Sequence, residues 1–316
     1  MASPPDLLTV ARVSPLLMVP LQAAFTLHDR LHEQDPTAFE RIAPRIRAIC
    51  CSAESKVSQE LIARLPALEI ISVMGVGYDG VDVAAAKARG VMVAHTPDVL
   101  NDDVADFALA LMLSIARRIP QADRYVRQGQ WAAGPMPLAR KMSGARLGLV
   151  GIGRIGQAIA DRARAFGMRI AYTARSAKAA LPYAFHPTPR ALAAVSDFLV
   201  VVTPGGAATR KLIDAEVLRA LGPEGCLVNV ARGSVVDEAA LIEALQQGVI
   251  AGAALDVFED EPRVPEALRA LDNVVLTPHI ASATTQTRQA MADRAMANLQ
   301  AHFAGQPLPS AVPECR

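Results

Sequence analysis

The sequence predicts an α/β protein with two parallel-sheet domains, each doubly wound with helices on both faces of its sheet. A length of 316 residues exceeds one ordinary core and suits two domains of about 100–200 residues each. Short runs of β-forming residues alternate with helical stretches along the chain, and this alternation is typical of parallel sheets.

Three apolar runs in the first part of the chain predict buried strands: RAICC (47–51), EIISVM (69–74) and VMVAHT (91–96). Helical patterns over 58–65 and 81–90 separate them. Parallel strands need such crossover helices, because each helix returns the chain to the same end of the sheet.

Six apolar runs in the second part predict a second sheet: ARLGLVGIG (145–153), MRIAYTA, SDFLVVVTP, CLVNVARG, AGAALDV and NVVLTPH. A strongly apolar helix is predicted over 102–119, and we expect it to bridge the domains or to pack against another subunit. An amphipathic helix over 284–305 follows the last strand, and the Pro-rich tail after it is expected to be extended.

The composition excludes several classes of partner. A balance of 32 basic against 31 acidic residues leaves a net charge of +1, which favours neither nucleic acid nor an anionic membrane. No stretch approaches the ~18 charge-free apolar residues of a membrane helix, and no signal peptide is recognised. The sequence has no CxxC motif and no Cys/His cluster, so we expect no metal site. We expect the protein to be cytoplasmic and its four cysteines to be free thiols: Cys50, Cys51, Cys226 and Cys315.

A G-x-G-x-x-G motif, formed by Gly151, Gly153 and Gly156, lies between an apolar strand and an Ala-rich helix. In this context the glycines allow a tight turn, a close approach of a pyrophosphate and close helix–strand packing. The helix N-terminus, which includes Arg154 and Ile155, offers N–H groups and positive charge to phosphates. The motif therefore predicts a Rossmann dinucleotide site.

The end of the next strand, at Ala174, Arg175 and Ser176, indicates which dinucleotide binds. An NAD site usually has an acidic residue there for the ribose hydroxyls, but no acidic residue occurs between Asp161 and Asp197. Arg175 can pair with a 2′-phosphate, Ser176 can donate a hydrogen bond to it, and Lys178 adds charge. We predict NADP(H), with NAD(H) used less well.

Three polar residues follow predicted strands of the second part: Arg232, Asp256 and His279. Doubly wound sheets bind ligands at the carboxyl ends of their strands. Glu261 lies in the loop that leads on from Asp256. Taken singly, each has a structural explanation, such as a salt bridge, a loop carboxylate or a packed histidine.

Taken together these segments resemble the D-isomer-specific 2-hydroxyacid dehydrogenases, in particular their glyoxylate/hydroxypyruvate reductase and hydroxyphenylpyruvate reductase branch. The resemblance covers essentially the whole chain, through MGVGYDGVD (74–82), TPDVLNDDVADFALAL (96–111), VGIGRIG (150–156), NVARGSVVDE (229–238), ALDVFEDEP (254–262) and LTPHIASAT (276–284). It implies a Rossmann cofactor domain, residues 99–280, inserted into a flavodoxin-like substrate domain made of residues 1–98 and 281–316.

The resemblance implies that Arg232, Glu261 and His279 act together in reducing a small 2-oxo acid. His279 would donate the proton. Glu261 would orient the imidazole and favour its protonated form. Arg232 would bind the substrate carboxylate and polarise the keto oxygen. The backbone of Gly75, Val76 and Gly77 would bind the same carboxylate.

The resemblance also implies supporting roles for other residues. Asp256 would contact the nicotinamide carboxamide, and Leu100 would be an apolar wall of the substrate pocket. Trp131, on a long arm before the glycine motif, would reach the pocket of a partner subunit, which predicts a homodimer. The cofactor cleft would also be lined by Thr203, Pro204, Val230 and Ala231.

Several alternatives stay open at this point. Met74 and Tyr78 are bulkier or less polar than the residues often found beside the carboxylate loop, so a larger or aromatic 2-oxo acid is an alternative substrate. An NAD-dependent oxidation of a 2-hydroxy acid is a second alternative. A nucleotide-sensing binding protein related to transcriptional corepressors is a third, from a different class.

Overall fold

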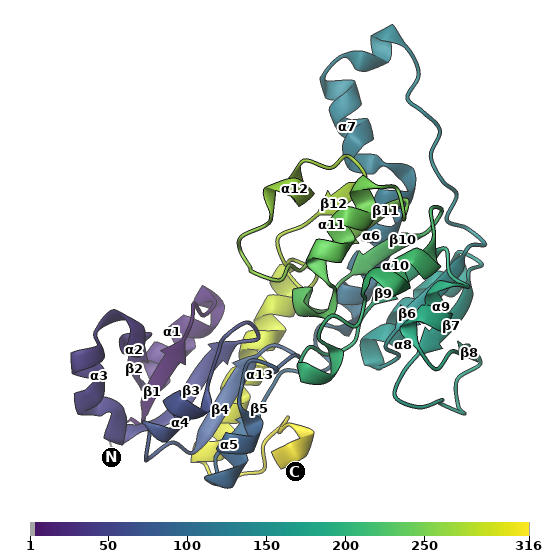
Figure 1. The fold of residues 1–316 in the computed structure, drawn as a ribbon. Helices are drawn as coiled ribbons and strands as arrows, with labels where there is room; N and C mark the ends of the chain where they lie inside the picture. Colours follow the sequence, from purple (N-terminus) through teal and green to yellow (C-terminus); the bar gives the residue numbers. More distant parts are fainter. Residues whose placement is uncertain (1–3, 316) are drawn as a thin grey trace. The chain divides into compact units, whose positions relative to one another are not determined.

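The structure, a computed structural model, describes residues 4–315 and divides them into two compact units (Figure 1). The N-terminal unit runs to Leu100 and resumes at Thr284, and the central unit is Asn101–Ala283. The domain boundaries expected from the sequence, at 98/99 and 280/281, lie two and three residues before these junctions.

The N-terminal unit contains a five-stranded parallel sheet in the order β2-β1-β3-β4-β5, which is the flavodoxin-like order. Its strands are β1 (Asp6–Val10), β2 (Thr26–Asp29), β3 (Ile46–Ser52), β4 (Ile70–Met74) and β5 (Met92–Ala94). The last three are the predicted strands. The first two were not predicted: β2 is a short edge strand without a fully buried residue.

Helices cover this sheet, and the long α13 packs against β4 and α1. The hydroxyl of Ser72 on β4 donates a hydrogen bond to the carbonyl of Ala295 on α13, at 3.0 Å. The helices of the unit are α1 (Pro15–Ala24), α2 (Leu31–Gln34), α3 (Pro36–Ile42), α4 (Gln59–Ala63), α5 (Val83–Ala88), α13 (Thr285–Phe303), and the 3-10 turns η1 (Ala43–Arg45) and η5 (Pro313–Cys315).

The central unit contains a seven-stranded parallel sheet in the order β12-β11-β10-β9-β6-β7-β8. The strand order reverses between β6 and β9, which is the switch point at which Rossmann folds bind dinucleotides. The strands are β6 (Arg146–Val150), β7 (Arg169–Thr173), β8 (Ala184–Phe185), β9 (Phe198–Val201), β10 (Cys226–Asn229), β11 (Gly252–Leu255) and β12 (Val274–Leu276). The six predicted strands are present, and the two-residue edge strand β8 is an addition.

The helices of the central unit lie on both faces of this sheet. They are α6 (Asn101–Arg117), α7 (Ile119–Arg127), α8 (Arg154–Ala165), α9 (Pro189–Ala193), α10 (Ala215–Leu221), α11 (Glu238–Gln246), α12 (Glu266–Arg269), and the 3-10 turns η2 (Gln130–Ala133), η3 (Ala207–Thr209) and η4 (Gly233–Val235). The apolar helix predicted over 102–119 is α6. It belongs wholly to the central unit, where it packs against α8 and β11.

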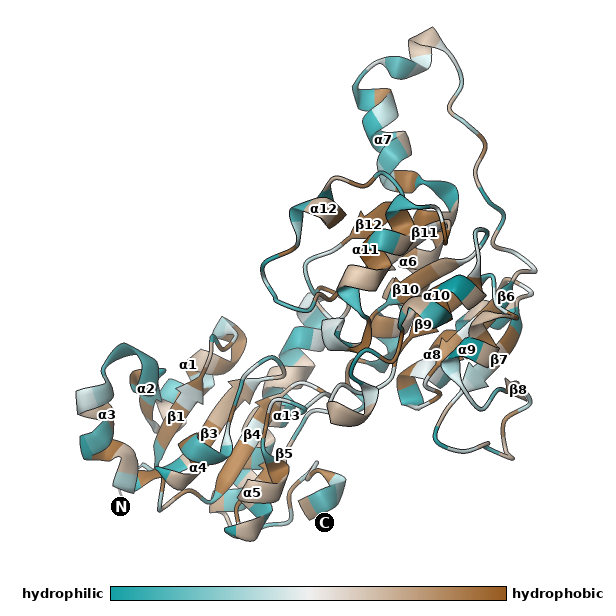
Figure 2. Ribbon diagram, viewed as in Figure 1, coloured by the Kyte–Doolittle hydropathy of each residue, from teal (hydrophilic) through white to brown (hydrophobic). Residues whose placement is uncertain are grey.

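Alternation along the strands divides the core of the central unit between the two faces of the sheet. Leu149 and Val200 belong to the cluster beneath α6 and α8, whereas Val150 and Val201 belong to the cluster on the opposite face. Strands buried on both faces read as continuous apolar runs, and the strands β3, β4, β11 and β12 are accordingly among the hydrophobic parts of the ribbon (Figure 2).

An arm made of α7, η2 and the segment up to β6 extends away from the sheet of the central unit (Figure 1). Most of its side chains are exposed, among them Trp131 at 69% and Leu138 at 99%, whereas Met142, close to β6, is buried. Within residues 4–315, no helix combines the length and the hydropathy needed to cross a membrane. All four cysteines are free, and Cys50, Cys51 and Cys226 are buried.

Candidate active site

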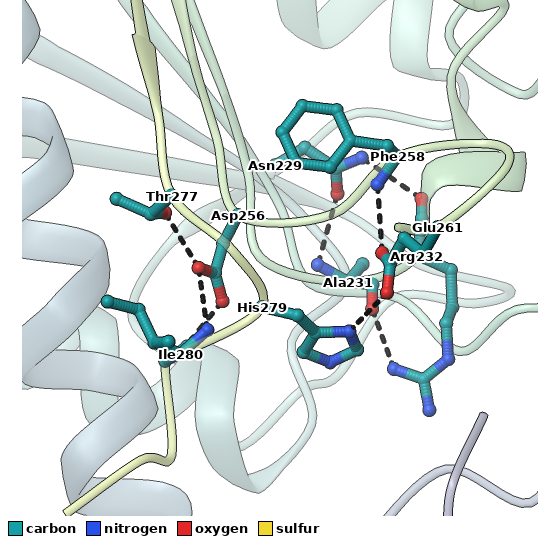
Figure 3. Close-up of polar contacts among 10 residues, drawn as sticks. Asn229, Ala231, Arg232, Asp256, Phe258, Glu261, Thr277, His279 and Ile280 are labelled. Atoms are coloured by element: carbon teal, nitrogen blue, oxygen red, sulfur yellow. Dashed lines mark hydrogen bonds and ion pairs between the residues drawn. The ribbon is translucent and has the colours of Figure 1, made fainter. Parts of the chain in front are cut away.

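Polar side chains meet where β10, β11 and β12 end at the same edge of the central sheet (Figure 3). Arg232 follows β10, Asp256 follows β11 and His279 follows β12. These strands are neighbours and parallel, so residues far apart in sequence come together at their carboxyl ends.

His279 and Glu261 form a hydrogen-bonded pair in this group. The Nδ1 atom of His279 lies 2.8 Å from Oε2 of Glu261, and both side chains are about one quarter exposed, at 24% and 25%. The other carboxylate oxygen, Oε1, accepts a hydrogen bond from the backbone N–H of Phe258 at 2.9 Å. Because a carboxylate only accepts hydrogen bonds, Nδ1 carries a proton in this pair.

Several effects act on the pKa of Glu261. Burial alone raises it, but hydrogen bonding to His279 and the charge of that ring outweigh burial, with help from the Phe258 N–H and the charge of Arg232. The net result is a pKa below the ordinary value of 4.5. Glu261 is therefore ionised at neutral pH and can stabilise a positive charge on His279.

Asp256 organises the loop that carries His279. Its Oδ1 atom accepts hydrogen bonds from the hydroxyl of Thr277 at 2.7 Å and the N–H of Ile280 at 2.9 Å, and Oδ2 accepts from the N–H of Ala281 at 2.8 Å. The backbone carbonyl of Asp256 also accepts from the N–H of His279, at 2.9 Å. Asp256 is almost fully buried. Its contact with a nicotinamide carboxamide stays a prediction.

His279 has a left-handed backbone conformation, with φ of 54°. A non-glycine residue in this region costs about 1–3 kcal/mol and persists only where surrounding contacts enforce it. The hydrogen bonds to Asp256 supply that enforcement on both sides of His279. Thr277, which sequence reasoning did not single out, belongs to the same network.

The loop of Arg232 is held by Asn229, the last residue of β10. The side chain of Asn229 accepts from the N–H of Ala231 and donates to the carbonyl of Arg232, both at 3.0 Å. A Cβ at Gly233 would lie 1.9 Å from the backbone of Phe258, so only glycine lets this loop pack against the loop of Glu261. Sequence reasoning also missed Asn229: an amide at the end of an apolar run is visible in the sequence, but its two hydrogen bonds are not.

The glycine loop at the switch point is open at Gly153. Gly151 has φ of +104°, and a Cβ at Gly156 would lie 2.6 Å from the carbonyl oxygen of Gly151. A Cβ at Gly153 would meet nothing within 4 Å. Helix α8 begins directly after Gly153, which provides no side-chain cap, so its first N–H groups are directed to this space. The predicted residues Arg154 and Ile155 form the first turn of α8.

The segment after β7 carries the predicted ribose-binding residues Ala174, Arg175 and Ser176, and the last two are exposed. The ammonium of Lys178 donates to the carbonyl of Ile152 at 3.0 Å, between the first two glycines of the motif. This contact holds the positively charged segment beside the glycine loop.

The other predicted cofactor residues surround the same edge. Thr203 and Pro204 follow β9, and the carbonyl of Val202 would lie 3.0 Å from a Cβ at Gly151. Val230 and Ala231 follow β10. The strand ends on both sides of the switch point thus contain all of the predicted cofactor residues except Asp256, which follows β11.

The remaining predicted substrate residues belong to other segments of the chain. Val76 and Gly77 are half-buried in the loop after β4 of the N-terminal unit, and Leu100 is buried at the end of that unit. Trp131 lies on the exposed arm of the central unit. Their contacts with a substrate stay predictions.

An acid–base pair at the same edge of a Rossmann sheet as the nucleotide loop is the arrangement of a nicotinamide-dependent dehydrogenase. Residues 109–281 match the family model of the D-isomer specific 2-hydroxyacid dehydrogenase NAD binding domain. The chain belongs to the D-isomer specific 2-hydroxyacid dehydrogenase family and is an oxidoreductase of that family.

Similar proteins cover most of the chain. A glyoxylate/hydroxypyruvate reductase from Arabidopsis thaliana is 49% identical, over 83% of this chain and 84% of its own length. A hydroxyphenylpyruvate reductase from Plectranthus scutellarioides is 49% identical, over 84% of this chain and 85% of its own length. The crystal structure of an NADPH-dependent glyoxylate/hydroxypyruvate reductase from Sinorhizobium meliloti, in complex with NADP and malonate, is 45% identical, with a TM-score of 0.94 over 99% of this chain and 98% of that one.

Proposed function

We propose that this protein reduces a small 2-oxo acid, glyoxylate or hydroxypyruvate, to the D-2-hydroxy acid with NADPH. The observation that carries the proposal is the His279–Glu261 pair, with its 2.8 Å hydrogen bond, beside Arg232 at the edge of the nucleotide-binding sheet. The relatives from Arabidopsis and Sinorhizobium, which are named for reduction of these acids, support the choice of substrate.

The residues of the central unit fit NADPH. The open space at Gly153 and the uncapped N-terminus of α8 suit the pyrophosphate, and Arg175 and Ser176 suit a 2′-phosphate. When bound, NADPH supplies the hydride for the keto carbon. Val230, Ala231, Thr203 and Pro204 would line the cofactor cleft, and Asp256 would contact the nicotinamide carboxamide.

The protein's own residues bind the substrate and move the proton. Arg232, together with the N–H groups of Val76 and Gly77, holds the substrate carboxylate. Arg232 also polarises the keto oxygen, on which negative charge develops. His279 then donates the proton from Nε2, because Glu261 engages Nδ1 and stabilises the charged ring.

NADPH oxidation with glyoxylate, hydroxypyruvate, phenylpyruvate and 2-ketogluconate tests this function. We expect turnover with glyoxylate or hydroxypyruvate. Turnover only of 2-hydroxy acids with NAD would favour the oxidative alternative. Tight nucleotide binding without turnover of any 2-oxo acid would favour a nucleotide-sensing protein.

A larger or aromatic substrate remains the alternative within this activity, and it is favoured by the relative from Plectranthus. The side chains of Met74 and Tyr78 do not indicate whether the substrate is small or large. The side chain of Met74 is buried, at 6% exposure, and the hydroxyl of Tyr78 donates to the carboxylate of Glu314 at 3.2 Å. Both side chains are therefore part of the packing of the N-terminal unit, and the preferred acid is decided by the assay.

Replacing Arg175 by Ala is expected to raise KM for NADPH about tenfold to a hundredfold, because a charge-assisted contact with the 2′-phosphate is worth about 1.5–3 kcal/mol. KM for NADH should not change. Steady-state kinetics with both cofactors check this, with the exposed Arg190→Ala as control. An equal loss with NADH would contradict the assignment of Arg175.

A homodimer in which Trp131 completes the partner's substrate pocket is part of the proposal, supported by the exposure of this ring on the arm. Trp131→Ala is expected to raise KM for the 2-oxo acid about tenfold or more, since burial of such a side chain is worth about 1.5–3 kcal/mol. Hybrids of Trp131→Ala with His279→Gln subunits should regain a normal KM, because one site then has both residues. A monomer in sedimentation velocity, or hybrids that keep the raised KM, would contradict it.

A further inference from the structure

A buried histidine of the N-terminal unit contacts the loop assigned to the substrate carboxylate. His95 follows β5 and is 8% exposed, and its Nδ1 atom lies 3.0 Å from the carbonyl oxygen of Val76. We propose that His95 is a positioning residue that orients the N–H groups of Val76 and Gly77 toward the substrate carboxylate. This inference rests on the proposed function, since it concerns binding of the same 2-oxo acid.

Two successive carbonyls of this loop are held by hydrogen bonds. The carbonyl of Gly75 accepts from the N–H of Thr96 at 2.8 Å, and the carbonyl of Val76 accepts from His95. Thr96 and His95 are adjacent, so both carbonyls are directed toward the segment that follows β5. In a trans peptide the C=O and N–H groups point in opposite directions. The N–H groups of Val76 and Gly77 are therefore both directed away from that segment.

Two neighbouring N–H groups that point the same way make a small site for an anion. A carboxylate has two oxygens and can accept from both. If the Val76–Gly77 peptide rotated, it would present a carbonyl oxygen to the substrate carboxylate, and like partial charges would repel. The contact with His95 opposes that rotation.

The contact does not depend on the protonation of His95. A backbone carbonyl only accepts hydrogen bonds, so Nδ1 must carry hydrogen in the neutral ring as well as in the charged ring. We therefore expect the role of His95 to be geometric, without a contribution to proton transfer.

The position of His95 is itself well determined. Its backbone N–H donates a hydrogen bond to the backbone carbonyl of Ser310 at 3.1 Å. Its backbone carbonyl accepts hydrogen bonds from the hydroxyl of Ser310 at 2.7 Å and from the side-chain amide of Asn298 at 3.2 Å. The ring of Tyr78 packs edge-on against the imidazole, with centroids 5.2 Å apart. The C-terminal segment thus supports the histidine that supports the loop.

The two ends of the loop are held by other contacts. A Cβ at Gly75 would lie 2.3 Å from the Cβ of Ala53, and a Cβ at Gly80 would lie 2.1 Å from the carbonyl oxygen of Ser55. These close approaches fix the backbone at the start and the end of the turn. Val76 and Gly77 are half-buried and lie between these two points, so loss of the His95 contact is expected to act on their peptide.

Three substitutions separate this role from packing. In His95→Asn the side-chain nitrogen lies close to the place of Nδ1 and can donate to Val76. In His95→Gln the nitrogen lies nearer the place of Nε2, and in His95→Leu no donor remains. We expect His95→Leu and His95→Gln to raise KM for glyoxylate and Ki for oxalate about tenfold, and His95→Asn to restore both. KM for NADPH should be unchanged in all three.

Thermal melts accompany the kinetics. Two results would overturn the role of His95. One is equal KM and Ki values in His95→Leu and the wild type. The other is a lower kcat and a lower melting temperature in all variants without a change in KM. If His95→Leu does not fold, the comparison of the Asn and Gln variants decides by itself, and equal KM values would count against the role. A wild-type protein without 2-oxo acid reduction would instead overturn the proposed function, and this inference with it.

Discussion

Replacement of His279 by Gln is expected to lower kcat for reduction of the 2-oxo acid by about 10²–10⁴-fold, the usual contribution of a general acid. Glutamine places its amide nitrogen near the position of Nε2 but cannot transfer a proton, so the variant removes the chemistry with little change in size. Substrate and cofactor binding should change much less than kcat, because Arg232 and the loop after β4 remain.

The pH dependence gives this prediction a second measurement. Reduction needs a protonated imidazole, so the wild-type rate should fall as the pH rises, whereas the residual rate of His279→Gln should lack that decline. Glu261 does not complicate the profile. In the folded protein its pKa is below 4.5, so the carboxylate stays ionised at neutral and higher pH. Its contribution to stability is present above its unfolded pKa and is lost only as the pH falls through the folded value.

His302→Gln is a matched control for the substitution. His302 also pairs with a carboxylate, Glu69, at 3.1 Å, but it belongs to α13 of the N-terminal unit and has no proposed contact with substrate or cofactor. We expect a rate close to that of the wild type. A loss smaller than tenfold in His279→Gln, or an unchanged pH profile, would remove His279 from the role of proton donor.

Replacement of Arg232 by Lys is expected to lower kcat/KM by about 10²–10³-fold, the cost of removing one donor from a developing oxyanion. Lysine keeps the charge but lacks the planar fork that can engage a carboxylate and a keto oxygen together. The loop itself should be unaffected, because Asn229 holds it through the backbone of Ala231 and Arg232.

Chemical rescue tests the planar shape of the Arg232 guanidinium group separately from its charge. Added guanidinium ion should partly restore activity to Arg232→Ala, whereas methylammonium should restore less. Arg190→Lys provides the control, since Arg190 is 70% exposed and pairs with Glu216. Wild-type kinetics in Arg232→Lys would contradict a bidentate role and would assign Arg232 to charge alone.

Some features of the fold were predictable from the sequence, and others were not. The glycine motif was predictable because its chemistry is local: a turn, a helix N-terminus and a close approach all occur within six residues, 151–156. Strand β2 was missed because it is a short edge strand without a fully buried residue. Strand β1 was not singled out either, although it is a buried run of five residues preceded by Pro4 and Pro5. Strand β8 is two residues long, and its pairing with β7 is a tertiary contact without a pattern in the chain.

The catalytic residues show the same division. Arg232, Glu261 and His279 were named from the sequence through the motifs that surround them. Their supporting residues, Asn229 and Thr277, were not, because a buried amide or hydroxyl gains a role only from its partners.

The sequence by itself determined the fold class, the dinucleotide loop and the chemical types of the site, because these depend on periodicity and on short motifs. The tertiary structure decided the geometry. It placed Nδ1 of His279 at 2.8 Å from Glu261, gave His279 a left-handed backbone through its hydrogen bonds to Asp256, and placed His95 against the carbonyl of Val76. These contacts join residues that follow different strands, and within each sheet only the pairing of parallel strands brings the strand ends together.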